Sequence, residues 1–308
     1  MIQEHATTLD QLWNRTKAYR QSEAYLETLR FVSAMREFSP YNAYLLRLQR
    51  PRLRFAATNY DWNYKFGRRV RLDDPQVHPL VVLWPFGPVE FVYDLADTDG
   101  DDLPAHILEP FYAGGRVERQ WWERLLDNMT RRGIGVAFVT EDVNSAGRVV
   151  RLSTPLPAPP NRGGTKAFPP IRFMVELNNR LDRTAQFFTL LHELAHVVCG
   201  HLGALTDDDW QDRKNEPEDV VEVEAESVAF VVGSRLGLSS PSETYLVDYT
   251  GRHGEMPKGV SITTVLTASW LLEEWTAELS WPKKPQRRAA AERARQQRRA
   301  ANSSGEDS

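Results

Sequence analysis

Apolar residues recur at intervals of three or four along several long stretches of the chain, which is the spacing of amphipathic α-helices. Ser39 and Pro40 break the first stretch and start a shorter helix that extends to Gln49, because Ser caps helices and Pro fits their first turn. The longer helices are predicted over residues 7–37, 116–132, 220–232 and 260–281.

Shorter apolar runs bounded by Gly, Pro and polar residues predict a small amount of β-structure. We expect a turn at residues 85–88 to join the first two strands, and we expect the last strand to lie at the edge of a sheet. The proline-rich segment 155–170 is predicted to be a long loop. The predicted strands, which together with the helices indicate an α+β protein, cover residues 79–84, 89–93, 134–140 and 171–177.

A strongly apolar helix is predicted to begin at a cap formed by Asp182 or Thr184 and to end at Gly200. It contains the pattern His192-Glu193-x-x-His196. Residues four apart lie on one face of a helix, so both imidazoles can bind one metal ion with Glu193 beside them as a proton acceptor. Burying these groups is costly unless they are paired or bind a metal. A core helix with hydrogen-bonded histidines is the alternative.

A catalytic zinc site needs three protein ligands and one open position. The next predicted helix carries Glu222, Glu224 and Glu226, of which the first and last share a face. We predict that Glu222 completes the site with His192 and His196 around one zinc ion. Glu226 is expected to accept the free N–H of a ligand histidine, and Glu224 to lie on the surface. A solvated face made by all three acids is the alternative.

Two further residues near the motif are not predicted to be ligands. His201 lies nine residues after His192, whereas the extended zinc motif places its last histidine ten residues after the first. We therefore expect His201 to be a loop residue or an outer contact of the site, and Cys199 to be a small apolar filler. A His/His/Glu set suits zinc and leaves manganese open.

The net charge of −4 excludes a global field of the kind that marks nucleic-acid binders, but the charge is unevenly distributed. Residues 36–72 carry nine Lys or Arg and two acidic residues. Cations that follow phosphates and rings that stack on bases are what single-strand binding requires. Composition by itself favours a solvated basic face over an aromatic core. The interleaved aromatic residues are Tyr41, Tyr44, Phe55, Tyr60, Trp62, Tyr64 and Phe66.

The rest of the composition indicates a cytoplasmic protein without membrane contact. A single cysteine allows no internal disulfide and favours a reducing compartment. The N-terminal residues lack the basic and apolar regions of a signal peptide, and no run approaches the ~18 apolar residues of a membrane span. Residues 282–308 carry eight Lys or Arg and three acids, which predicts a disordered basic tail. This tail either adds electrostatic affinity for nucleic acid or keeps the chain soluble.

Two regions resemble known families. Residues 188–201 and 222–230 resemble the ImmA/IrrE-type metallopeptidase pattern, in which the first glutamate of Glu-x-Glu-Ala is the third ligand, here Glu222. The upstream half resembles the N-terminal single-stranded-DNA-binding domain of ArdC-type antirestriction proteins, and the order of the two halves also matches. The upstream resemblance lies in residues 39–46, 49–51, 62, 67–70, 92–94 and 98–100.

The resemblance implies three parts. Residues 1–105 would form a helix-plus-small-sheet domain that binds single-stranded DNA. Residues 116–281 would form a mainly helical, zincin-like metallopeptidase domain with a small sheet, followed by the tail 282–308. The DNA contacts implied are Asn42, Arg50, Trp62, Arg68, Arg69 and Arg71.

The function predicted from the sequence is peptide-bond hydrolysis by a zinc-activated water, with Glu193 as the general base and a protein or peptide as substrate. Single-stranded DNA is the second predicted partner, as in antirestriction proteins of the ArdC type. Two alternatives stay open. One is a non-proteolytic protein that binds single strands and protects incoming DNA. The other is an ImmA-type regulatory protease that cleaves a repressor without binding DNA.

Overall fold

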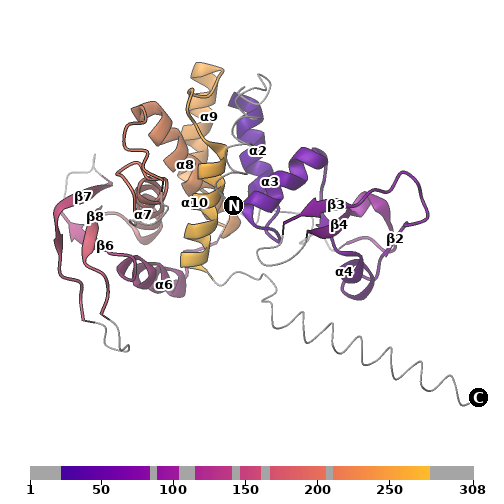
Figure 1. The fold of residues 1–308 in the computed structure, drawn as a ribbon, viewed down its shortest axis with the longest axis horizontal. Helices are drawn as coiled ribbons and strands as arrows, with labels where there is room; N and C mark the ends of the chain where they lie inside the picture. Colours follow the sequence, from indigo (N-terminus) through magenta and orange to yellow (C-terminus); the bar gives the residue numbers. More distant parts are fainter. Residues whose placement is uncertain are drawn as a thin grey trace, which may run out of the picture. The chain divides into compact units, whose positions relative to one another are not determined.

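The computed structural model describes residues 22–83, 89–103, 115–140, 146–160, 167–205 and 211–277. Predictions for residues 7–21, for the turn at 85–88 and for the tail 282–308 lie outside the described residues. The described residues combine helices with small sheets, which confirms the predicted α+β class (Figure 1). None of the helices in these ranges has the length and apolar character needed to cross a bilayer.

The N-terminal half combines short helices with two small antiparallel sheets. Ser39 caps the second helix by accepting a hydrogen bond from the backbone N–H of Asn42 at 3.3 Å, as predicted. The helices are α2 (Ser22–Ala34), α3 (Pro40–Gln49) and α4 (Asn59–Tyr64). One sheet has the order β1-β4-β3 and the other pairs β2 with β5. The strands are β1 (Ala56–Ala57), β2 (Arg69–Val70), β3 (Leu80–Val82), β4 (Glu90–Asp94) and β5 (Thr98–Asp99).

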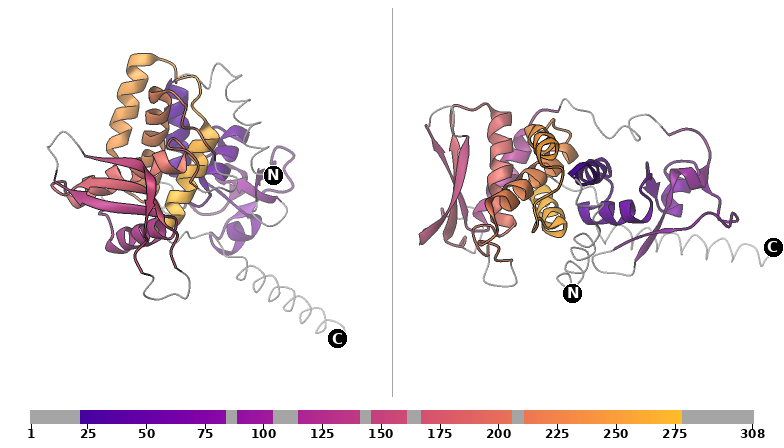
Figure 2. Two further views of the ribbon diagram at one scale, coloured as in Figure 1. Left: turned by 60° about the vertical axis from the view of Figure 1, so that its left-hand side comes forward. Right: turned by 90° about the horizontal axis from the view of Figure 1, so that it is seen from above.

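The C-terminal half contains a three-stranded sheet and five helices in the described residues. The helices are α6 (Arg119–Thr130), α7 (Arg183–Val198), α8 (Glu218–Arg235), α9 (Pro241–His253) and α10 (Ile262–Thr276). The strands are β6 (Ile134–Val139), β7 (Gly147–Leu156) and β8 (Ile171–Asn178). Helix α7 packs against β7 and β8 on one side and against α8 and α10 on the other (Figure 2).

The prediction of an edge strand at residues 171–177 is wrong, because β8 is the central strand of this sheet. It runs parallel to β6 and antiparallel to β7. Strand β7 was not predicted, and its end overlaps the predicted loop 155–170. Most of its side chains are exposed, so it lacks the alternation of apolar and polar residues that marks a half-buried strand.

Helix α8 joins the two halves of the described chain. The hydroxyl of Tyr25 on α2 hydrogen bonds the hydroxyl of Ser227 on α8 at 2.8 Å, and both side chains are buried. Near the end of α8, the buried guanidinium of Arg235 donates to backbone carbonyls at the end of α2 and in the segment that follows it. Helix α8 therefore packs against α2 and also carries the acidic residues of the candidate site.

Candidate metal centre

Helix α7 holds the two histidines in a rigid setting. Its first turn is capped by the side chain of Asp182, which accepts a hydrogen bond from the N–H of Ala185 at 2.9 Å. Gly200 follows its last turn with φ +78°, a conformation that favours glycine. Most of the helix is buried, which agrees with its apolar sequence. Local sequence therefore fixes both ends of the helix and places His192 and His196 one turn apart.

Three residues with potential ligand atoms converge where α7 packs on α8. His192 Nε2 lies 3.1 Å from His196 Nε2 and 3.5 Å from Glu222 Oε2. His196 Nε2 lies 3.6 Å from Glu222 Oε1. A tetrahedral zinc site with bonds of 2.0–2.1 Å needs ligand atoms about 3.3–3.4 Å apart. The donor set and its spacing therefore fit one divalent ion.

The protonation of this cluster also suits a cation. Burial lowers the pKa of His192, but hydrogen bonds to the carboxylates of Glu222 and Glu226 outweigh that effect and raise the pKa to about 10. Burial and the charge on His192 lower the pKa of His196 to about 3. The hydrogen bond from His192 lowers the pKa of Glu222. At neutral pH His192 thus carries a proton next to the carboxylates of Glu222 and Glu226, and a metal ion bound there would replace that proton.

Glu193 and Glu226 stand beside the three potential ligands. Glu193 is partly buried; burial raises its pKa, and the charge on His192 lowers it to a smaller extent. The backbone of Val149 on β7 hydrogen bonds this carboxylate. Glu226 Oε1 lies 3.4 Å from His192 Nδ1, the ring nitrogen that faces away from Glu222. One carboxylate is therefore placed to accept a proton and the other to orient a ligand ring.

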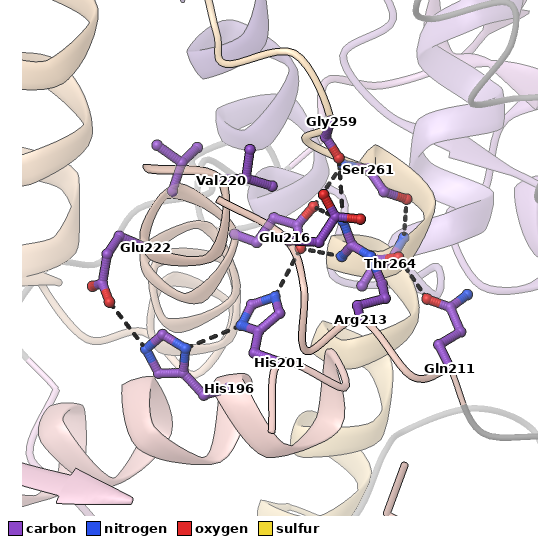
Figure 3. A network of polar contacts seen from close by, with 12 residues as sticks. His196, His201, Gln211, Arg213, Glu216, Val220, Glu222, Gly259, Ser261 and Thr264 are labelled. Carbon is purple, nitrogen blue, oxygen red and sulfur yellow. Dashed lines mark hydrogen bonds and ion pairs between the residues drawn. The ribbon is translucent and has the colours of Figure 1, made fainter. Parts of the chain in front are cut away.

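The prediction that Glu224 lies on the surface is wrong. This carboxylate has no exposed area and accepts a hydrogen bond from the N–H of Ser261 at 2.7 Å. Both of its oxygens also bind the guanidinium of Arg213. His201 Nε2 lies 2.9 Å from Glu224 Oε2. His201 Nδ1 lies 3.0 Å from His196 Nδ1 (Figure 3). His201 thus contacts the ring of His196 through the nitrogen that faces away from Glu222, as an outer contact of the candidate site.

Sequence reasoning missed Arg213 because it lies in an irregular segment with no motif. The sequence gives only an indirect indication of such a partner. Glu224 points away from the face shared by Glu222 and Glu226, so a helix that is apolar on its remaining surface must bury at least one of these acids. In the structure α8 is buried on nearly all sides. A buried acid on such a helix needs a cationic partner. The two basic residues that most closely precede the helix are Arg213 and Lys214.

Several residues predicted to contact DNA use their polar groups inside the protein. The amide of Asn42 exchanges two hydrogen bonds with the backbone of Leu83. Trp62 is fully buried, and its indole N–H donates to the carbonyl of Tyr93 at 2.9 Å. The buried guanidinium of Arg68 binds Thr98 and the carbonyls of Gly100 and Asp101.

The other three predicted DNA contacts are more accessible. Arg50 is partly buried and pairs with Asp94 and Asp97. Arg71 is partly exposed and pairs with Asp99 at 3.0 Å. The guanidinium of Arg69 is exposed, and its contact with the exposed Asp73 is long, at 3.5 Å. Assignment of DNA contacts to these residues stays a prediction.

The segment from β7 to α8 encloses the complete His192, His196 and Glu222 set. Residues 149–232 match the family model of the IrrE N-terminal-like domain, Peptidase_M78. This match confirms the predicted ImmA/IrrE-type pattern for that segment.

Comparison with solved structures gives a second finding. Two similar structures are those of the antirestriction protein ArdC from plasmid R388, one metal-free and one bound to Mn(II). They are 13% and 15% identical to this chain, cover 83% and 82% of it, and are themselves covered to 98%. The TM-score is 0.36 for both. No curated protein matches the sequence.

Proposed function

We propose that this protein is a zinc-dependent peptidase of the ImmA/IrrE type that also binds single-stranded DNA, as antirestriction proteins of the ArdC type do. His192, His196 and Glu222 would hold one zinc ion, and Glu193 would act as the general base. The observation that carries the proposal is the convergence of three potential ligand residues between α7 and α8. The two Nε2 atoms lie 3.1 Å apart, and the two carboxylate oxygens of Glu222 lie 3.5 and 3.6 Å from them, close to the spacing in a tetrahedral site.

A divalent ion bound there supplies Lewis-acid chemistry, because it polarises a water molecule and a substrate carbonyl. Glu193 accepts the proton of the attacking water and passes it to the leaving nitrogen. Burial raises the pKa of Glu193, which brings its proton affinity closer to the working pH. The backbone hydrogen bond from Val149 holds its carboxylate in place.

Exchange of Glu193 for Gln tests the peptidase proposal. We expect Glu193→Gln to retain zinc and to lose hydrolysis by about 10²- to 10⁴-fold, because general-base catalysis contributes that much. Cleavage of a peptide library by the full-length protein, with and without chelator, measures the effect. Glu218→Gln, at an exposed position in the first turn of α8, is the matched control. Cleavage by Glu193→Gln at the wild-type rate would exclude the general-base role.

The proposal of single-strand binding rests on exposed rings and cations in the N-terminal half. Tyr60 and Tyr64 on α4 are 59% and 77% exposed, and their ring centroids lie 4.5 Å apart. Exposed aromatic rings are stacking surfaces for unpaired bases. Phe55, Trp62 and Phe66 instead pack with one another in the core of this half. Exposed cations of the same basic segment are Arg52, Arg54, Lys65 and Arg69.

Gel shifts with single- and double-stranded DNA test this second part. Replacement of Tyr60 or Tyr64 by Ala should weaken single-strand binding by about 5- to 150-fold, because stacking contributes about 1–3 kcal/mol per base. Trp270→Ala, which removes a partly exposed ring from α10, is the control. Binding that survives chelation together with absent proteolysis would favour a protective DNA-binding protein. No binding at low salt would favour a regulatory protease.

A further inference from the structure

We infer that His201 is a positioning residue that sets the tautomer and orientation of His196 for the metal, and that Glu224 and Arg213 anchor it. The inference rests on the proposed metal site and extends it to residues that bind no metal. Its basis is a continuous chain of polar contacts that starts at a ligand ring and ends in a buried ion pair (Figure 3).

The buried end of the chain is firmly held. Glu224 accepts hydrogen bonds from Arg213 Nη2 at 2.9 Å and from the N–H of Ser261 at 2.7 Å, and Arg213 Nη1 contacts its other oxygen. Arg213 also donates to the carbonyl of Gly259 at 3.1 Å. A carboxylate surrounded by donors can only accept. His201, which lies 2.9 Å away through Nε2, must therefore donate to Glu224.

With a neutral His201 imidazole, this assignment determines the protons along the chain. Once His201 Nε2 carries a hydrogen and donates to Glu224, its Nδ1 is free to accept. His196 Nδ1 lies 3.0 Å from that atom, so the contact requires a hydrogen on His196 Nδ1. The lone pair of His196 then lies on Nε2, which is the atom that faces His192 and Glu222. The chain thus selects the tautomer of His196 that can bind a metal.

The two ligand histidines are supported in different ways. His192 Nδ1 faces Glu226 directly at 3.4 Å, and this carboxylate is partly exposed. His196 Nδ1 faces a second imidazole, and the carboxylate follows one residue further on. His201 and Glu224 are both buried, whereas the partners of His192 are not. We therefore expect the His196 arm to be the more rigid of the two.

A second metal site does not explain the same residues. Ligand atoms of Cys199, His201 and Glu224 also lie within 4.8 Å of one another. The guanidinium of Arg213, however, already contacts both oxygens of Glu224. A metal there would have to displace a buried ion pair, which is costly. The cluster is therefore a support for His196.

Zinc affinity of the full-length chain tests the inference. We expect His201→Leu to bind zinc about 10- to 100-fold more weakly than the wild type, because loss of an outer partner of a ligand has that effect. His201→Gln should recover most of the affinity, since an amide offers one acceptor and one donor. The control is Tyr25→Phe, which removes a buried hydrogen bond to α8 without touching the chain. Competition with a chromophoric chelator measures all four proteins.

If the wild type binds zinc and His201→Leu binds within twofold of it, the inference is wrong and the proposed metal site stands. If the wild type binds no zinc, both fail. If His201→Leu does not fold, ¹⁵N-histidine NMR of the zinc-loaded wild type decides. We expect a proton on Nδ1 of His196 and on Nε2 alone of His201, and a proton on Nδ1 of His201 would overturn the inference.

Discussion

Replacement of Arg235 by Met should destabilise the protein more than any exposed charge change. The side chain of Arg235 has no exposed area and donates from Nε to Glu273 Oε2 at 2.8 Å. Its two terminal nitrogens donate to four backbone carbonyls at 2.7–3.2 Å, those of Val32, Met35, Arg36 and Phe38. One buried guanidinium thus connects α8 to α10 and to the end of α2.

The expected loss follows from these contacts. Breaking a buried ion pair by removing one partner costs about 3–5 kcal/mol, because the other charge is left unpaired. The four carbonyls each add a desolvation cost of about 1–3 kcal/mol wherever water cannot replace the guanidinium. Such terms are not additive, so we take about 3–5 kcal/mol as the minimum loss. Domains are typically stable by about 5–15 kcal/mol, and the variant should therefore be close to unfolding.

Urea denaturation of the full-length protein, followed by far-UV circular dichroism, measures this loss. Arg30→Met is the control, because its pair with Glu243 is 45% and 42% exposed and should contribute less than about 1 kcal/mol. Combining Arg235→Met with Glu273→Leu should restore part of the stability, since no unpaired charge remains. A loss below about 1 kcal/mol for Arg235→Met would refute the reasoning.

Three further predictions concern the metal, a helix end and the separability of the halves. Zinc affinity should rise about tenfold per pH unit from pH 6 to 8, because neighbouring carboxylates raise the pKa of His192 to about 10 and the ring must lose its proton to bind zinc; a flat chelator-competition profile would contradict this. Gly200→Ala should lower the unfolding free energy by at least about 1 kcal/mol in urea titrations, because its φ is +78° and an added Cβ would collide with the carbonyl of Gln211. Residues 116–281 expressed without the N-terminal half should show a broad, early thermal transition, because α8 would lose its contact with α2; a melting curve like that of the full chain would exclude this.

Features that depend on neighbouring residues could be predicted from the sequence. Helix α7 and the spacing of its two histidines are local features, and the structure has them as expected. Of the two cap candidates, Asp182 and Thr184, the structure uses Asp182. Glu222 could be predicted as well, because periodicity put it on one face and the family resemblance favoured the same residue. Its position beside both rings depends only on how two helices pack.

Features that depend on distant segments could not be predicted. The partners of Glu224 come from the irregular segment before α8 and from the residue before α10, so no local pattern indicates its burial. Which cations of residues 36–72 are paired also depends on distant segments. Arg50 pairs with Asp94 and Asp97, which lie more than 40 residues further along the chain. Sequence composition shows how many cations a segment has and does not show which of them face solvent.

The central claim is that two histidines on α7 and one glutamate on α8 hold a single divalent ion. Anomalous diffraction at the zinc edge, from crystals of the full-length protein grown with zinc, tests it most directly. The account predicts one strong peak between the helices, within about 2.0–2.2 Å of Nε2 of His192, Nε2 of His196 and a carboxylate oxygen of Glu222. A peak elsewhere, or none at this position in zinc-loaded crystals, would contradict it.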